Sequence, residues 1–433
     1  MERIIKFINV EKNFWPILLL IFLSYFSGFV FNENHGGAKE DLLLHTYPAI
    51  ISFKLNGFKD TIYNYGQFQE LTYPLHHILH GLFNPSIENI ILFRTTTLFI
   101  SLISIYLIFL NLKNKFKLKN KICVLISSLI LLSPYYRGSA FFGLHEVTGY
   151  LFLLLTLYYF NNIKKNNTYN IIFICVFSSL ALYTRNQYVF LPIFFLFYFF
   201  LNHKYSNLGL AFAIYSIFSI PGLYLIYIWN GLIHPEFGEP ISSYINLVNI
   251  PFGVSVFFCN LFLFIFPFWI FYIATIDTNK LKNFIKKNFF YFVFILCFFL
   301  SLYNLLNFDI FKNGTNQGKI FGLGSVIKYI NYFFPKYDWV YLIISSLSLV
   351  FFINIIKMNL KNFILSTLII FLFSIRIHLY TEYFDPLFFI LFLFLFDLKK
   401  FKYNLTVNYS FFFIVFFIYN TTILLLSFIS MVL

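Results

Sequence analysis

The chain has 433 residues, of which 60% are hydrophobic and only 11% are charged. Soluble domains carry about 25% charged residues and need that polar surface to cover their apolar interior. The composition therefore excludes an ordinary water-soluble protein and indicates an integral membrane protein. The net charge of +14 comes largely from lysines in short loops between apolar runs, so we expect no nucleic-acid partner.

The apolar runs predict an all-α, polytopic transmembrane protein, because one span needs about 20 apolar residues. The run from Phe14 to Phe31 has no small-residue cleavage site, so we interpret it as an uncleaved first helix. Two runs are short, which leaves 12 or 13 spans. The predicted spans lie near 14–32, 88–112, 121–135, 146–161, 170–184, 187–202, 207–229, 250–275, 288–307, 338–356, 361–377, 386–398 and 406–432. No linker or repeat interrupts them, so residues 1–433 are predicted to form a single integral membrane domain.

Basic residues predict the orientation of these spans. With Arg3, Lys6 and Lys12 in the cytoplasm, every second loop carries lysines, as the positive-inside rule requires. These loops hold Lys113, Lys115, Lys117, Lys119, Lys121, Lys164, Lys165, Lys204, Lys280, Lys282, Lys286, Lys287, Lys357, Lys361, Lys399, Lys400 and Lys402. An amino-acid composition low in Ala and rich in Lys, Asn and Phe is typical of an AT-rich bacterium. We therefore expect a cell inner membrane, or the endoplasmic reticulum membrane if the protein is eukaryotic.

The first outer loop, about 32–87, is predicted to contain two amphipathic helices at the membrane interface, His45 to Phe58 and Pro74 to Phe83. No separate soluble domain is expected. The remaining outer segments are Pro134 to Glu146, Arg185 to Gln187, Asn230 to Asn249, Asp309 to Asp338, and Arg376 to Pro386.

An acidic segment near the start of this loop is the first catalytic candidate. Asp41 and His45 are four residues apart and share a face if the segment is helical. Asp41 could serve as a general base towards a sugar hydroxyl, with Glu40 as a second candidate, while His45 holds a phosphate or the acceptor. The alternative is that Asp41 only caps the start of a helix.

The same loop contains His76, His77 and His80 at helical spacing. His76 and His80 could form a metal pair, but no carboxylate or cysteine stands beside them. We therefore favour histidines of an interfacial helix and predict no metal site. The four cysteines lie inside apolar runs without a CxxC pair, which argues against disulfide, zinc and thiol chemistry.

Arginines near the outer ends of spans are the candidates for substrate binding. An unpaired guanidinium in a membrane costs several kcal/mol, and arginine can hold a phosphate with two hydrogen bonds. The alternative is that these arginines extend to the interface or pair with nearby acids. Arg94 lies deeper than the others. The predicted substrate-binding residues are His45, Arg137, His145, Glu146, Arg185, Arg376, His378 and Glu382.

Four short segments occur in a familiar order. Asp41-Leu42-Leu43-Leu44-His45 matches an Asp-Glu-x-Phe-His motif at its first and last positions, with Leu42 in place of the glutamate. Arg185-Asn186-Gln187 is similar to an Arg-Gln-Thr-Asn motif, and Trp229-Asn230-Gly231 matches Trp-Asn-Gly. Glu382-Tyr383-Phe384-Asp385-Pro386 is similar to Glu-x-Arg-Tyr-x-x-Pro without its arginine, which Arg376 could replace.

Through these segments the chain resembles the GT-C superfamily of membrane glycosyltransferases. Within it, the nearest likeness is to the family that adds the terminal α-1,2 glucose to dolichol-linked oligosaccharide, and to its bacterial relatives. The resemblance implies a polyprenyl-phosphate sugar as donor, a glycan or lipid-linked acceptor, and inversion at the anomeric carbon on the non-cytoplasmic face. It leaves the sugar, the linkage and any divalent cation open.

Two other functions are compatible with a polytopic chain. A transporter or flippase of lipid-linked sugars would place polar groups near the bilayer midplane and often contain paired repeats. An oligosaccharide polymerase or ligase would concentrate its polar residues in a late outer loop. Scarce midplane charge and the absence of a repeat favour the transferase.

Overall fold

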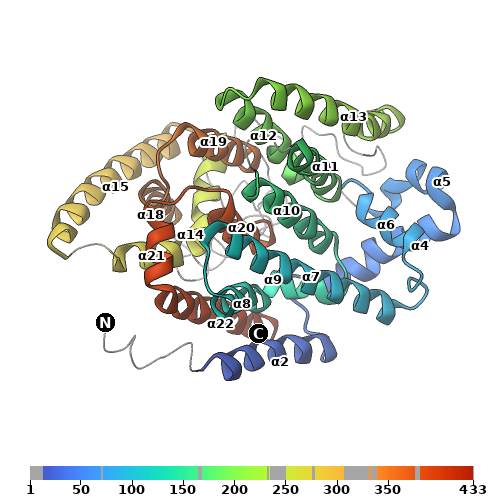
Figure 1. The fold of residues 1–433 in the computed structure, drawn as a ribbon, viewed down its shortest axis with the longest axis horizontal. Helices are drawn as coiled ribbons and strands as arrows, with labels where there is room; N and C mark the ends of the chain where they lie inside the picture. The colour runs from blue at the N-terminus through green and yellow to red at the C-terminus, as the bar shows by residue number, and fades with distance from the viewer. Residues whose placement is uncertain are drawn as a thin grey trace. The chain divides into compact units, whose positions relative to one another are not determined.

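The structure is a computed structural model that describes residues 13–69, 72–163, 168–231, 234, 250–275, 278–306, 330, 333, 339–375 and 381–432. Within these ranges every regular element is a helix (Figure 1), and the one strand-like pairing is an isolated bridge between Ile356 and Leu398. The predicted all-α class is therefore confirmed. The chain divides into two compact units, Met1–Ile241 with Phe416–Leu433, and Ser242–Val415. The prediction of a single membrane domain is not tested by this division.

Unit 1 begins with an apolar helix, continues through the short helices of the first loop, and then forms a series of longer helices. Its elements are α2 (Phe14–Val30), α3 (Ala38–Asp41), the π-helix η1 (Leu42–Thr46), α4 (Tyr47–Leu55), α5 (Gly57–Tyr63), η2 (Tyr65–Phe68), α6 (Leu75–Phe83), α7 (Ile90–Phe116), α8 (Asn120–Ser128), η3 (Leu129–Leu132), α9 (Pro134–Phe142), α10 (His145–Asn161), α11 (Thr168–Thr184), η4 (Asn186–Val189), α12 (Phe190–Leu201), α13 (Tyr205–Trp229) and, from Phe416 onward, α22 (Tyr409–Val432).

A bend at Ser133 sets the direction of α9. The α8–η3 segment and α9 differ in direction by 77°. Ser133 caps α9 by accepting a hydrogen bond from the Tyr136 amide at 3.1 Å, and Pro134 stands at the first helical position. Both residues favour a new helix start, because proline lacks the amide hydrogen that continues a helix and serine satisfies an unpaired one. At the other end, Gly143 has a φ of +68° and ends α9.

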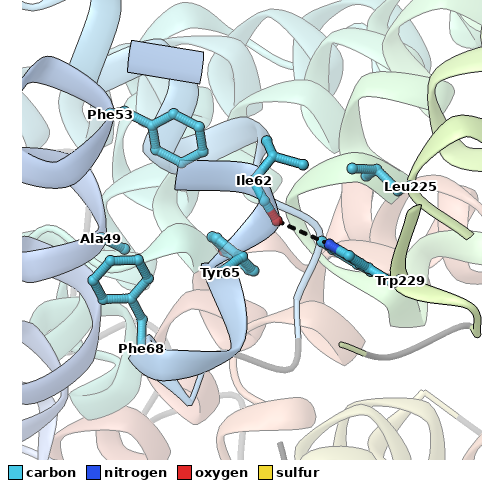
Figure 2. Packing of buried hydrophobic residues seen from close by; sticks show 7 residues of the cluster. All are labelled: Ala49, Phe53, Ile62, Tyr65, Phe68, Leu225 and Trp229. Carbon is cyan, nitrogen blue, oxygen red and sulfur yellow. Dashed lines mark hydrogen bonds between the residues drawn. The ribbon is translucent and has the colours of Figure 1, made fainter. Parts of the chain in front are cut away.

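The helices of the first loop pack on one another and on the end of α13. A buried cluster joins Ala49, Phe53, Ile62, Tyr65 and Phe68 to Leu225 and Trp229 (Figure 2). The Trp229 indole nitrogen donates a hydrogen bond to the Ile62 carbonyl at 3.0 Å, and its ring stacks on Tyr65 with centroids 5.8 Å apart. Trp229 of the Trp-Asn-Gly segment thus attaches the first loop to a long apolar helix.

Unit 2 is dominated by phenylalanine packing around α14. Its elements are α14 (Ile250–Ala274), α15 (Thr278–Leu306), α18 (Val340–Ile355), α19 (Leu360–Ser374), η9 (Thr381–Tyr383), α20 (Leu387–Phe394), α21 (Phe401–Val407) and the first part of α22. α14 packs against α18 and α19. The approach to α19 is close, because a Cβ added at Gly253 would lie 1.9 Å from the Ser374 carbonyl oxygen.

The helices coincide with the predicted spans, but fewer of them are long enough to cross a bilayer by themselves. Four described helices are long and apolar enough, Ile90–Phe116, Tyr205–Trp229, Phe252–Ala274 and Tyr409–Phe428, and a fifth appears if the bent pair α8–η3 and α9 is one span. Five shorter apolar helices of 10–17 residues fall on further predicted spans. A chain with several apolar helices of this kind is compatible with a multi-pass membrane protein, whereas 12 or 13 crossings stay a prediction.

A helix lies in each of the two first-loop segments that were predicted to be amphipathic, and of these α6 is amphipathic whereas α4 is not. The segment predicted at 45–58 consists of the end of η1, α4 and the start of α5, and the segment predicted at 74–83 is α6. Their placement at a membrane interface stays a prediction.

Candidate functional site

The acidic segment of the first loop is helical, but its helix changes type at the segment itself. α3 ends at Asp41, and Leu42–Thr46 forms a π-helix before α4 begins. π-helices are rare in proteins, and where a single π-turn occurs it is often at a functional site. The Asp41 side chain is partly exposed, and His45 Nδ1 lies 2.9 Å from the Phe68 carbonyl oxygen. Glu40 is exposed and accepts a hydrogen bond from the Asn34 amide at 2.9 Å, which indicates a role in fixing the loop.

A buried ion cluster lies directly before this segment. The Glu33 carboxylate pairs with the Arg137 guanidinium and with His35 Nε2, and the three residues are 7%, 1% and 2% exposed. Arg137 also donates to the side chain and the carbonyl of Ser24 on α2, at 3.0 and 2.7 Å. His35 Nδ1 lies 2.8 Å from the Ser427 hydroxyl. These contacts occupy Arg137, so the geometry favours a structural role over the predicted contact with substrate.

Close packing connects this cluster to Asp41. α3 packs against α9, and a Cβ added at Gly138 would lie 2.9 Å from the His35 carbonyl oxygen and 3.2 Å from the Ala38 side chain. Only glycine allows such an approach without a shift of the neighbouring atoms. The helix that ends at Asp41 therefore rests on α9, beside Arg137.

A second buried ion cluster lies on the other side of α9. Arg185 and His145 each approach the same Glu146 carboxylate oxygen at 3.2 Å, and the Ser139 hydroxyl donates to the other oxygen at 3.4 Å. Glu146 stands in the first turn of α10, where the helix dipole favours a carboxylate. The predicted residues His145, Glu146 and Arg185 are thus brought together, although Glu146 stands at the start of α10 and Arg185 follows the end of α11.

The order of the chain suggested a different pairing. Because Arg137 shortly precedes Glu146 in the chain, an ion pair between these two residues was the alternative to substrate binding by Arg137. On α9, however, Arg137 and Ser139 are two residues apart and therefore point to different sides. Ser139 contacts Glu146, whereas Arg137 contacts Glu33.

Histidines of α6 connect this helix to the end of α9 and to α10, close in the chain to Glu146. His76 Nε2 lies 3.0 Å from the Gly143 carbonyl oxygen, and Nδ1 lies 2.9 Å from the Thr148 hydroxyl of α10. Because a carbonyl can only accept, Nε2 carries the proton and Nδ1 accepts from the hydroxyl. His77 Nδ1 lies 2.7 Å from the Tyr65 hydroxyl. These histidines are buried and form internal hydrogen bonds, whereas the position of their helix at a membrane interface stays a prediction.

An open, mostly apolar groove of about 270 Å³ lies between α6, α7 and α10. Its walls include Phe83 of α6, Ile100 of α7, and Thr148 and Phe152 of α10. Thr148 is two residues after Glu146, so α10 contributes to the polar cluster and to the groove from different sides. Exposed apolar side chains of α7, such as Leu92 and Phe99, continue the surface beyond it.

The remaining candidates are Arg376, His378, Glu382 and Arg94. Arg376 and His378 lie outside the described residues. Glu382 lies in η9 of unit 2. Arg94 donates from Nε to the Phe141 carbonyl at 2.6 Å, and its guanidinium lies over the rings of Phe29 and Phe142. These contacts stabilise the cation in place of an acidic partner.

Sequence reasoning missed Glu33 and His35. Both stand within five residues of the predicted end of the first span, and an acid two residues before a histidine at that place is a signal the sequence offered. No group of three or more His, Cys, Asp or Glu side chains is placed to hold a metal ion within the described ranges. The chain matches no protein-family model, no curated protein and no solved structure.

Proposed function

We propose that the chain is a membrane glycosyltransferase of the GT-C type, which transfers a sugar from a polyprenyl-phosphate donor to a glycan or lipid-linked acceptor on the non-cytoplasmic face. The donor has a charged phosphate next to a long apolar chain. A site for it needs basic and polar groups beside an apolar groove that lipids can reach.

The arrangement of α10 carries this proposal. Its first turn holds Glu146 against Arg185 and His145, and Thr148 already lines the apolar groove. On the proposal, Arg185 and His145 contact the donor phosphate and the groove takes part of the prenyl chain. Arg376 and His378 are further candidates for the phosphate, and Glu382 for the acceptor.

Asp41 supplies the base in this scheme. The acceptor hydroxyl gives its proton to the Asp41 carboxylate as its oxygen attacks the anomeric carbon, and the bond to the phosphate oxygen breaks with its electron pair. Attack opposite the leaving phosphate inverts the anomeric centre. Partial exposure of Asp41 fits a group that must meet a second substrate, and the packing of its helix, α3, on α9 fits a group that must be held still.

The test is a transfer assay with the full chain reconstituted in liposomes. Radiolabelled undecaprenyl-phosphate glucose, galactose and mannose serve as donors, and extracted glycolipids and glycans serve as acceptors. We expect label to move from at least one donor into an acceptor. Asp41→Asn should lower that rate by about 10²–10⁴-fold, the usual contribution of a general base, while the partly exposed site leaves folding unchanged. Glu88→Gln, which alters an exposed carboxylate of the same loop, is the matched control.

Each outcome has a consequence. Near-normal transfer by Asp41→Asn removes Asp41 from the mechanism. Movement of labelled lipid between leaflets without a new glycosidic bond identifies a flippase and overturns the proposal. So does a folded protein that transfers none of the sugars.

A further inference from the structure

Three segments of unit 2 carry lysines and lie together. One is the third turn of α15, which contains Lys287, the second connects α18 to α19, and the third connects α20 to α21. The lysine cluster, as we name it, consists of Lys287, Lys357, Lys361, Lys399, Lys400 and Lys402.

Hydrogen bonds hold these segments to one another. The Lys357 amide donates to the Asp397 carbonyl at 2.7 Å, and the Lys399 amide donates to the Ile355 carbonyl at 2.8 Å. The Asn354 amide group, in the last turn of α18, donates to the Asn288 side chain of α15 at 2.6 Å. The cluster is therefore a built feature of the fold and not a set of independent loops.

The cluster has far more positive than negative charge. Asp397 accepts from the Lys361 ammonium at 3.0 Å and from the Asn359 amide at 3.2 Å. No carboxylate of the described residues pairs with the other five lysines. The Lys399 ammonium donates to the Ile353 carbonyl at 3.0 Å, at the end of α18 where the helix dipole favours a cation.

Lys287 and Lys399 are close enough to repel one another. Burial, and secondarily the charge of Lys287, lower the pKa of Lys399 below its ordinary value. An anion placed between the two ammonium groups would remove this repulsion.

Large apolar side chains surround the lysines and are exposed. They include Phe290 (71%), Met358 (64%), Phe363 (61%) and Tyr403 (70%). Lysines interleaved with exposed apolar and aromatic residues are typical of the boundary between hydrocarbon and headgroups. A ligand at this surface should therefore have both an anionic and an apolar part.

We propose that the lysine cluster binds the headgroup of an anionic glycerophospholipid, with Lys287 and Lys399 as the principal phosphate contacts and the exposed apolar side chains against its acyl chains. Charge complementarity selects an anionic lipid over a zwitterionic one. Basic groups near a membrane surface attract such headgroups, and each lysine contributes roughly fivefold in affinity.

The test uses the purified full chain in detergent, with phosphatidylglycerol and phosphatidylcholine as probes and native mass spectrometry as the readout. We expect phosphatidylglycerol to bind at least tenfold more tightly than phosphatidylcholine. The Lys287→Gln/Lys399→Gln variant should lose roughly 25-fold in affinity for phosphatidylglycerol, from two lysine contacts. Lys113→Gln/Lys117→Gln, which removes the same charge at the exposed end of α7, should change it less than twofold.

Lys287→Gln alone controls for folding, because the Lys287 side chain is exposed and makes no hydrogen bond among the described residues. We expect it to lose about fivefold in affinity with an unchanged melting temperature. Equal losses in the cluster variant and the α7 variant, or equal binding of both lipids by the natural chain, would overturn the proposal. Binding of soluble polyanions such as heparin in preference to the lipid would also overturn it, in favour of a macromolecular partner.

Discussion

The Glu33 carboxylate and the Arg137 guanidinium form an ion pair between two residues that are 104 positions apart in the chain. The pair joins the end of the first apolar helix to α9, and His35 completes it from the same loop. Since α3 and Asp41 follow immediately, the pair also fixes where the acidic segment of the first loop begins.

Breaking this pair should destabilise the protein strongly. Arg137→Ala leaves the Glu33 carboxylate buried without its guanidinium, which typically costs about 3–5 kcal/mol. The double variant Glu33→Gln/Arg137→Met should recover much of the loss, because no buried charge remains. Melting temperatures of the purified variants in one detergent measure both effects. Lys54→Ala breaks an ion pair with the exposed Glu88 and should have little effect; an equal loss there would contradict the prediction.

The Glu146–Arg185 pair allows stability and function to be separated. Arg185→Ala should lower both the melting temperature and sugar transfer, because it leaves the buried Glu146 carboxylate without its guanidinium partner. Adding Glu146→Gln should recover stability but not transfer, if Arg185 contacts the donor phosphate. The measurements are melting temperature and initial transfer rate at saturating and limiting donor. Full recovery of transfer in the double variant would assign the pair to structure alone.

Acid should destabilise unit 1 through the histidines of α6. Burial lowers the pKa of His80 to about 4 and lowers the pKa of His76 well below its ordinary value of 6.5. In the unfolded chain both titrate near 6.5, so below that pH the unfolded state binds protons that the folded state does not. The free energy of unfolding should therefore fall by about 1.4 kcal/mol per pH unit and per histidine as pH decreases from 6.5, for His80 down to about 4.

Melting temperatures measured between pH 7.5 and 4.5 check this slope. His80→Gln should reduce the slope, whereas His203→Gln, at an exposed turn, should leave it unchanged. An identical slope in all three proteins would show that other groups control acid sensitivity.

Contact between α4 and α6 depends on the absence of a side chain at Gly81. A Cβ there would lie 2.6 Å from the Phe53 side chain and 2.7 Å from the Ile50 carbonyl oxygen. Gly81→Ala should therefore destabilise the protein by about 1–3 kcal/mol, as overpacking does. Gly209→Ala is the matched control, because nothing lies within 4 Å of its Cβ position and alanine favours a helix. It should raise the melting temperature slightly or leave it unchanged.

Helix positions were predictable from the sequence because they depend on local composition. Each predicted span coincides with a helix, from α2 to α22, because apolar runs of this length favour a helix over a strand. Lengths were less predictable: α20 has eight residues where thirteen were expected, because Pro386 and the turn after Phe394 set its ends. The break at Ser133 splits one predicted span in the same way.

The residue types of the candidate site were predictable from the sequence, but which arginine pairs with which acid was not. Arginines and acids near outer span ends were recognised, and Glu146 and Arg185 do meet. Glu33 was overlooked because its partner Arg137 is distant in the chain, and such long-range pairs follow from packing. Trp229 was identified through a family resemblance, yet its hydrogen bond to Ile62 could not be read from the sequence.

The π-helix at Leu42–Thr46 contains one residue more than an α-helical turn of the same height. This wider turn takes up the extra residue, so α3 and α4 keep about the relative orientation of two segments of one continuous α-helix. In a turn of ordinary α-helical width, the same extra residue would rotate Asp41 by roughly 100° about the helix axis relative to α4. The direction of the Asp41 carboxylate is thus set by the π-turn as well as by side-chain identity.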